Sequence, residues 1–462
     1  MASKRLSPVP RLGLLFDYDW DAVAHQRFAG EIAFDRAGFD LFRWSGRLHL
    51  LRLNLFSFAD RLAARGRSRR WRGVVSHHEL YGTLLAAMVA ERLGLPGPGV
   101  GAVLACHHKG YTRGILQSLC PEVNPRWELV QPPNMPGRGS RTPPEMLVPP
   151  YPERFPVYLK PVRATFSALA RSIHDPTAWQ AYFSALLEDR WVTNRLLAPF
   201  AHVLHHVLPE AGSSFQFLSE EPVWSPQYNL DGYVDGAGDV QLLGVVDAVS
   251  YPGTQAFQRW EYPSRLPVSV IQSALLVARK FLRAIGFGQG FFNLEFFYDA
   301  AASRITVIEF NPRLSSQFSA LYRMVLGCDP HAMAMALAQG EDPRRVPLVK
   351  PTARVAASLV WRAFDPREIP TAPSRVARRR LEQAFPGQTL FEFSRTPAAL
   401  SRAFRWMESY RYGVVNVGAV DSEGLRRQSE QISEILGWPN GPYAQHLSEL
   451  SRGSGHWTAR AH

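Results

Sequence analysis

The chain has few cysteines and no long apolar run. It contains three cysteines, Cys106, Cys120 and Cys328, and this odd number at wide spacing predicts neither a disulfide framework nor a zinc site. The apolar segments LLAAMVA and SALLVA are far shorter than the ~20 residues that a membrane-spanning helix requires. The N-terminal segment lacks the apolar core of a signal peptide. We therefore expect a cytoplasmic protein with no membrane partner.

Sequence signatures of several enzyme classes are missing as well. No GxGxxG follows the first strand-like segment, RLGLLFDY, so no dinucleotide fingerprint is predicted. No serine lies in a GxSxG context, and a nucleophilic hydrolase therefore has no support. His202 and His206 have the i, i+4 spacing of some zinc enzymes, but no HExxH motif accompanies them and an amphipathic helix explains the spacing. Neighbouring residues point in different directions on a strand or a helix, so no metal site is predicted at His77–His78 or His107–His108.

The chain is long and carries an excess of positive charge. Its 462 residues are enough for two to four domains, and 46% hydrophobic with 20% charged residues is typical of a globular protein. Its 52 Lys and Arg against 40 Asp and Glu give a net charge of +12. Such an excess can attract nucleic acid or an anionic substrate, or it can belong to an arginine-rich surface with no partner. The basic residues are scattered and not interleaved with aromatic ones, so we expect no nucleic-acid partner.

Strand and helix patterns divide the chain into three regions. Residues 1–120 alternate between strand-like and helix-like runs in the manner of an open α/β sheet. Residues 121–345 mix strands and helices in an α+β pattern, and residues 350–462 form a small C-terminal region. Residues 131–152 are rich in proline, which indicates an inserted loop and not a core element.

Two apolar, strand-like segments, FFNLEFFYD and VIEFNPR, each contain one glutamate. If the chain turns around residues 301–303, the two segments form an antiparallel hairpin. Counting outward from that turn places Tyr298 opposite Thr306, and Glu295 opposite Glu309. Directly opposed residues share one face with Cβ atoms ~5 Å apart, so two carboxylates there repel each other unless something compensates.

A divalent cation would compensate this repulsion. Asn311 lies two residues beyond Glu309, and strand alternation keeps it on the same face. Its amide adds a third oxygen of the hard type that Mg²⁺ prefers. The hairpin therefore indicates a metal site formed by Glu295, Glu309 and Asn311. For the hairpin alone, a polar face exposed to solvent is the alternative.

The order of these residues resembles a known family. Glu295 followed by Glu309-x-Asn311-x-Arg313 is similar to the metal-binding strands of the ATP-grasp enzymes, in their carboxylate-amine ligase and biotin carboxylase branches. Other segments agree in order and spacing over roughly residues 73–340. The resemblance implies a Rossmann-like domain at residues 1–120, a two-lobed ATP-grasp domain at 121–345 and a small C-terminal domain at 350–462.

The resemblance also implies roles for individual residues, with ATP and Mg²⁺ or Mn²⁺ as cofactors. The lysines of ACHHKGYTRGIL and FPVYLKP, Lys109 and Lys160, would bind phosphates, and backbone groups of Gln216, Phe217 and Leu218 would bind the adenine. Arg313 would bind an acyl phosphate or a carboxylate, and Arg265 is a further candidate for anion binding. One departure is that residues 161–170 contain no glycine where the family has a glycine-rich phosphate loop.

The implied reaction is ATP- and Mg²⁺-dependent ligation of small molecules. A substrate carboxylate would be activated as an acyl phosphate and captured by an amine or a similar nucleophile. One alternative is activation of bicarbonate, as in biotin carboxylase. Another is a catalytically inactive relative that acts as a binding module, which the missing glycines favour and the opposed carboxylates oppose. A homo-oligomer is compatible with the sequence, which does not identify the acid or the amine.

Overall fold

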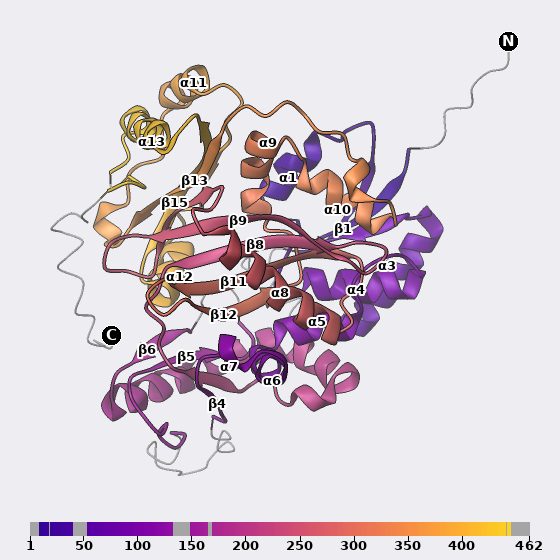
Figure 1. The fold of residues 1–462 in the computed structure, drawn as a ribbon, viewed down its shortest axis with the longest axis vertical. Helices are drawn as coiled ribbons and strands as arrows, with labels where there is room; N and C mark the ends of the chain where they lie inside the picture. The colour runs from indigo at the N-terminus through magenta and orange to yellow at the C-terminus, as the bar shows by residue number, and fades with distance from the viewer. Residues whose placement is uncertain are drawn as a thin grey trace.

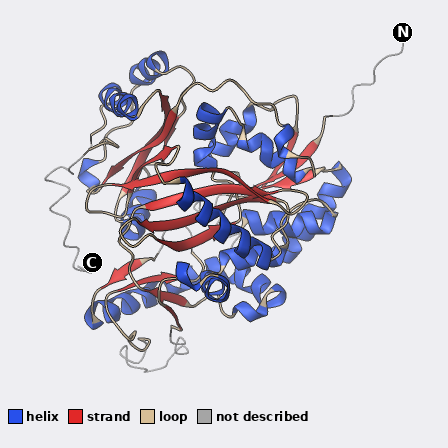
Figure 2. Cartoon of the chain, in the orientation of Figure 1, coloured by secondary structure: helices blue, strands red, loops and turns tan. Residues whose placement is uncertain are grey.

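The computed structural model is a mixed α/β fold, as the sequence predicts (Figure 1, Figure 2). It describes residues 9–17, 19–39, 53–132, 148–164, 169–439 and 441–444, without the side chains of residues 187–196 and 406. Within these ranges the strands form three sheets. No helix in the described ranges is both long and apolar enough to cross a membrane. The three cysteines are buried free thiols.

The first sheet is parallel and lies near the N-terminus. Its strands are in the order β2-β1-β3, with bounds Ala33–Ala37, Arg11–Leu15 and Gly73–Val75. The accompanying helices are α1 (Asp19–Gln26), α3 (Leu55–Arg69), α4 (Gly82–Leu93), α5 (Val100–His107) and α6 (Lys109–Leu119). Helix α4 consists largely of Ala, Leu and Val, and it is buried along most of its length. It ends at Gly94, whose φ of 63° is the left-handed conformation that glycine adopts without strain.

The second sheet is antiparallel and has the strand order β4-β7-β5-β6. The bounds are Trp127–Val130, Phe217–Glu220, Val157–Pro161 and Arg171–Ile173. The long helix α7 (Pro176–Val207) packs on this sheet through Trp179 and Phe183, which are buried with Leu159 and Phe217. Figure 1 shows this lobe below the rest of the molecule. The proline-rich segment lies mostly outside the described residues, which resume at residue 148.

The third sheet has eight antiparallel strands and forms the centre of the molecule (Figure 1). In spatial order these are β12 (Arg304–Asn311), β11 (Gly290–Asp299), β8 (Gln227–Val234), β9 (Val240–Ser250), β10 (Phe257–Tyr262), β13 (Val355–Ala363), β15 (Tyr410–Ala419) and β14 (Leu390–Glu392). Helix α8 (Val268–Ala284) covers one face, where Leu294 and Phe296 of β11 are buried. Because side chains alternate along a strand, Asn293 and Glu295 point to the other face.

Strands from residues 121–345 and from residues 350–462 belong to this same sheet. β13 pairs with β10, so the sheet crosses the domain boundary that the sequence indicates. Helices α11 (Arg375–Ala384), α12 (Pro397–Met407) and α13 (Ser422–Leu436) accompany the C-terminal strands, while α9 (Ser319–Leu326) and α10 (Pro330–Ala338) contribute to the core on the face opposite α8. The 3-10 helices are Pro121–Val123, Pro209–Ala211, Ser316–Phe318, Pro343–Arg345 and Pro366–Glu368.

Candidate active site

Strands β11 and β12 place Glu295 directly opposite Glu309, as the sequence predicts. Nearer the turn the predicted register is wrong by one residue, because Tyr298 pairs with Ile305 and not with Thr306. One extra residue in β12, Ile308, forms a β-bulge that restores the pairing of the two glutamates. The opposed carboxylates therefore depend on a bulge as well as on the turn.

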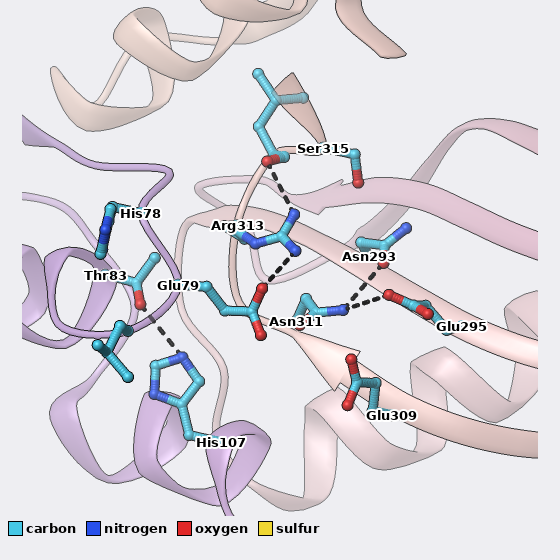
Figure 3. Close-up of polar contacts among 12 residues, drawn as sticks. His78, Glu79, Thr83, His107, Asn293, Glu295, Glu309, Asn311, Arg313 and Ser315 are labelled. Carbon is cyan, nitrogen blue, oxygen red and sulfur yellow. Dashed lines mark hydrogen bonds and ion pairs between the residues drawn. The ribbon is translucent and has the colours of Figure 1, made fainter. Parts of the chain in front are cut away.

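Asn311 joins this pair through a short chain of hydrogen bonds (Figure 3). Its Nδ2 donates to Glu295 Oε1 at 3.0 Å and to Asn293 Oδ1 at 3.2 Å. Asn293 in turn donates through Nδ2 to Asp231 Oδ1 at 3.0 Å. The predicted metal ligands thus lie together on the sheet face that α8 does not cover, and hydrogen bonds fix the orientation of the Asn311 amide.

Asp231 accepts the last hydrogen bond of this series, and the sequence did not predict its role. Its side chain is fully buried and accepts hydrogen bonds from Ser315 Oγ and from Tyr322 OH, each at 2.7 Å. Burial raises the pKa of Asp231 to about 6, although these hydrogen bonds favour the ionised form. Asp231 therefore positions Asn293, and through it Asn311, without reaching the cluster itself.

The two glutamates differ in charge state. Burial, and then the nearby carboxylate of Glu309, raise the pKa of Glu295 to about 8. Burial would raise the pKa of Glu309 too, but the ammonium of Lys109 outweighs it, and the pKa of Glu309 is lowered. At neutral pH the metal-free pair accordingly holds one proton, on Glu295.

Lys109 lies at the first residue of α6 and contacts the carboxylate pair. Its Nζ is 2.8 Å from Glu309 Oε2 and donates to the Ala164 carbonyl oxygen at 3.0 Å. His108 caps the helix, and its Nδ1 accepts a hydrogen bond from the Tyr111 N–H at 3.0 Å. This cap fixes where α6 begins and therefore the position of Lys109. Residues 165–168, which follow Ala164 in the glycine-free loop, lie outside the described residues.

Lys160 of β5 lies in a buried ionic network. Its Nζ is 2.7 Å from Glu220 Oε2, and Arg113 Nε is 2.5 Å from Glu220 Oε1. Burial lowers the pKa of Lys160, while Glu220 opposes that shift. Arg113 also donates to the carbonyl oxygen of the bulged Ile308 at 3.3 Å. This network, whose Glu220 and Arg113 were not predicted, connects the second sheet to the carboxylate hairpin.

The adenine contacts predicted for Gln216, Phe217 and Leu218 do not fit this geometry. Strand β7 is an inner strand, and both Phe217 and Leu218 pair with β4 on one side and β5 on the other. An inner strand uses its backbone groups in the two ladders, so none is left for a base. The Gln216 carbonyl oxygen accepts from the Val162 N–H at 3.0 Å. The chain leaves the sheet only after Glu220, and the hinge to β8 is residues 221–226.

Arg313 follows β12 and is held by a glutamate from the N-terminal region. Its Nη2 donates to Glu79 Oε2 at 2.8 Å, and Figure 3 shows this pair next to Asn311. Glu79 lies in the segment after β3, and its side chain is buried. The N-terminal region therefore contributes Glu79 to the cluster, and no local motif in the sequence indicated this contact.

The structure does not bring Arg265 to the cluster. Its guanidinium is exposed to solvent and lies 2.9 Å from Glu261, and its backbone N–H donates to Asp247. Glu261 pairs with Asp247 on the neighbouring strand, and Asp247 pairs with Tyr228. Tyr228 pairs with Phe296, whose side chain lies on the face that α8 covers, so Glu261 lies on that face as well. Glu295 points to the opposite face. Arg265 therefore lies apart from the carboxylate cluster, and its role in anion binding stays a prediction.

Comparison with known proteins identifies the domain that carries these residues. Residues 153–320 match the family model described as an ATP-grasp domain. This segment includes Lys160, the hairpin of β11 and β12, and Arg313. Residues 153–320 therefore form an ATP-grasp domain, as the motifs in this segment indicated.

Solved structures share the fold over nearly the whole chain. An L-amino acid ligase from Bacillus licheniformis is 14% identical with a TM-score of 0.64, and the match covers 92% of this chain and 97% of that one. The N5-carboxyaminoimidazole ribonucleotide synthetase of Thermus thermophilus is 14% identical with a TM-score of 0.56, covering 92% and 98%. A biotin carboxylase from Campylobacter jejuni is 13% identical with a TM-score of 0.56, covering 92% and 91%. A comparison with curated proteins found no match. At these identities the likeness shows a common fold.

Proposed function

We propose that the protein is an ATP- and Mg²⁺-dependent ligase that activates a small-molecule carboxylate as an acyl phosphate for attack by an amine or similar nucleophile. The observation that carries this proposal is the opposed pair of Glu295 and Glu309, with Lys109 and Arg313 directed at the same cluster. A binding module that performs no chemistry has no physical reason to keep two carboxylates directly opposite each other. The ligases among the structural relatives are consistent with this reaction class.

The residues fit a divalent cation. Glu295, Glu309 and Asn311 offer carboxylate and amide oxygens, which are the hard donors that Mg²⁺ and Mn²⁺ prefer. Burial and the carboxylate of Glu309 raise the pKa of Glu295 to about 8, and a divalent cation would favour the ionised form of both glutamates. We assign these three residues as the metal ligands. When bound, the metal would neutralise phosphate charge during phosphoryl transfer.

The two lysines would bind the phosphates of ATP. Lys109 and Glu309 form an ion pair, and ATP binding would require this pair to exchange partners. Glu309 would turn to the cation and Lys109 to a phosphate oxygen, which keeps each charge compensated. Lys160 is held close by Glu220, and its buried ammonium would contact phosphate from the second sheet.

Arg313 would act on the acid substrate. In the first step a carboxylate oxygen of the substrate attacks the γ-phosphorus, and ADP leaves. In the second step the amine forms a bond to the acyl carbon, inorganic phosphate leaves, and the amine loses a proton to solvent or a base. A guanidinium can hold two oxygens of the carboxylate or acyl phosphate at once, and Glu79 fixes its orientation.

An assay of ADP release tests this proposal. The purified protein is incubated with ATP and Mg²⁺ against amino acids, dipeptides, fatty acids and bicarbonate, singly and with amines, and products are identified by mass spectrometry. We expect ADP and phosphate to form only when a carboxylate and an amine are both present. Turnover with bicarbonate alone would instead support a carboxylase-like activity. ATP binding without turnover in every mixture would support an inactive binding module.

A further inference from the structure

Three metal-ligating side chains from distant parts of the sequence meet behind the candidate active site. Asp21 lies on α1, His77 follows β3, and His331 lies in the first turn of α10. Each is at most 5% exposed, and one ligand atom from each lies within 4.8 Å of the other two. Figure 1 shows α1, α10 and β1 gathered on one side of the molecule.

The contacts within this Asp21–His77–His331 cluster leave ring nitrogens without partners. His331 Nε2 lies 2.9 Å from Asp21 Oδ1, and the rings of His77 and His331 meet edge to face with centroids 5.7 Å apart. Among the described residues, His77 Nε2 and His331 Nδ1 have no hydrogen-bond partner. A buried polar atom without a partner costs free energy, so a hydrogen-bond network alone does not account for this arrangement.

The charge states suit metal binding. Burial would raise the pKa of Asp21, but the hydrogen bond from His331 and the nearby imidazoles hold that pKa well below its usual range. Burial lowers the pKa of His77 to about 3. The cluster therefore presents an ionised carboxylate and a neutral imidazole at neutral pH, which are the forms that bind metal ions.

We propose that Asp21, His77 and His331 bind a zinc ion with a structural role. Two imidazole nitrogens and one carboxylate oxygen favour a first-row transition metal over Mg²⁺ or Ca²⁺. Ligands of a tetrahedral zinc ion lie roughly 3.4 Å apart. Binding therefore requires the more distant ligand atoms, which lie within 4.8 Å of one another, to approach by up to about 1.4 Å, and Asp21 and His331 to separate slightly from 2.9 Å. The hydrogen bond between Asp21 and His331 would be replaced, with the ring proton of His331 moving to Nδ1.

The burial of the cluster decides between a structural and a catalytic metal. A catalytic site keeps a position open to water or substrate, whereas these three side chains are closed off from solvent. His25 is the candidate for a fourth ligand. Its ring packs edge to face against His331 at 5.5 Å between centroids, and within the described residues its Nε2 has no hydrogen-bond partner.

The ion would connect the N-terminal sheet to helix α10. Its ligands come from α1, the segment after β3 and α10, and α10 already packs on β3 and α1. His77 lies two residues before Glu79, which holds Arg313. Zinc would therefore fix the segment that carries Glu79. This proposal does not depend on the reaction that the protein catalyses.

Direct metal binding to the full chain tests the proposal. The exposed pair His202 and His206 is first removed by H202A and H206A, because two histidines at this spacing can bind zinc adventitiously. The chelator-treated protein is then titrated with Zn²⁺ against a competing indicator, and Co²⁺ absorption reports the coordination. We expect one ion per chain with submicromolar affinity, and at least a ~100-fold loss in His77→Gln and in His331→Gln, more than the loss of an outer-shell group causes.

The melting temperature, measured with zinc and with a chelator, tests the proposal even if the histidine variants do not fold. In the parent protein Zn²⁺ is expected to raise the melting temperature and a chelator to reverse the rise, because a ligand that binds the folded state stabilises it. Asp21→Asn, which preserves size and shape, is expected to fold and to lose most of this zinc-dependent rise. The proposal is overturned if the parent binds Zn²⁺ more weakly than about 10 μM. Zinc affinity or Co²⁺ absorption that is unchanged in folded His77→Gln and His331→Gln would overturn it equally.

Discussion

Lys109 and Glu309 form an ion pair in which Nζ and Oε2 are 2.8 Å apart. We assign Lys109 to a phosphate of ATP and Glu309 to the metal. In the ion pair the ammonium occupies the place of the metal beside Glu309, and the carboxylate occupies the place of the phosphate beside Lys109. This pairing explains how the site tolerates its charges without ATP. It also means that removing either residue changes the charge state of the other.

Lys109→Met should weaken binding of Mg²⁺–ATP by about tenfold or more, since a charge-assisted contact contributes roughly 1.5 to 3 kcal/mol. It should also raise the pKa of Glu309, because the ammonium is what keeps that carboxyl ionised. Calorimetric titration with a non-hydrolysable ATP analogue measures the affinity. Lys280→Met, at an exposed lysine of α8, is the matched control and should bind as the parent does. Equal affinity in the Lys109 and Lys280 variants would remove Lys109 from the site.

Glu295→Gln should change how the stability of the metal-free protein depends on pH. The pKa of Glu295 is about 8 in the folded chain against about 4.5 for an ordinary glutamate, so unfolding releases its proton between these values. The free energy of unfolding therefore falls as pH rises from 6.5 to 8.5, by on the order of 2 kcal/mol from this group. Glutamine does not titrate, so the variant should lose this decline.

Urea unfolding between pH 6.5 and 8.5 with a chelator present measures the effect, because burial raises the pKa of Asp231 only to about 6 and lowers the pKa of His77 to about 3, both below that range. Glu128→Gln, at an exposed glutamate of β4, serves as control and should follow the parent. If the curves of the parent and Glu295→Gln run parallel over this range, Glu295 does not carry the proton.

The sequence was sufficient to predict the carboxylate hairpin, for a local reason. Strand alternation and a short turn decide which residues face each other over a few positions, so Glu295, Glu309 and Asn311 could be placed together. The bulge at Ile308 was missed because alternation does not mark an extra residue. Two errors in counting, the turn register and the bulge, cancelled at the glutamates.

Residues whose partners come from distant segments could not be predicted in this way. Glu79 reaches Arg313 only because the N-terminal sheet packs beside the hairpin, and no spacing in the sequence reports that approach. The same holds for Glu220, which joins Lys160 to Arg113. Arg265 was chosen from its local motif, yet the sheet face on which it lies is set by strand pairing. The adenine contacts stay a prediction that the pairing of β7 on both sides does not favour, and the sequence did not indicate that β7 is an inner strand.

Lys160→Met should weaken ATP binding by about tenfold and also destabilise the fold. The substitution leaves Glu220 with one cation, Arg113, in a buried position, and breaking a buried ionic network costs about 3 kcal/mol or more. The double variant Lys160→Met, Glu220→Gln should recover part of that stability but not the ATP affinity. Urea unfolding and calorimetry measure the two effects separately. Recovery of ATP affinity in the double variant would show that Lys160 serves only the fold.

Arg313→Lys should leave ATP affinity nearly unchanged and reduce turnover by about 10²-fold, if its partner is the acyl phosphate that develops during the reaction. A lysine keeps the charge but cannot hold two oxygens while contacting Glu79. Arg265→Lys is the matched control, and its turnover should equal that of the parent because this arginine lies outside the cluster. Equal losses of affinity and turnover in Arg313→Lys would reassign the residue to nucleotide binding.

The central claim is that Glu295 and Glu309 bind the metal that ATP requires. The most direct test compares the affinity for a non-hydrolysable ATP analogue with and without Mg²⁺, in the parent and in the double variant Glu295→Gln, Glu309→Gln. This comparison needs no knowledge of the acid or the amine. Our account predicts that Mg²⁺ tightens binding to the parent by at least tenfold and has little effect on the variant, because linkage requires a metal site in the protein. The same Mg²⁺ dependence in both proteins would contradict it.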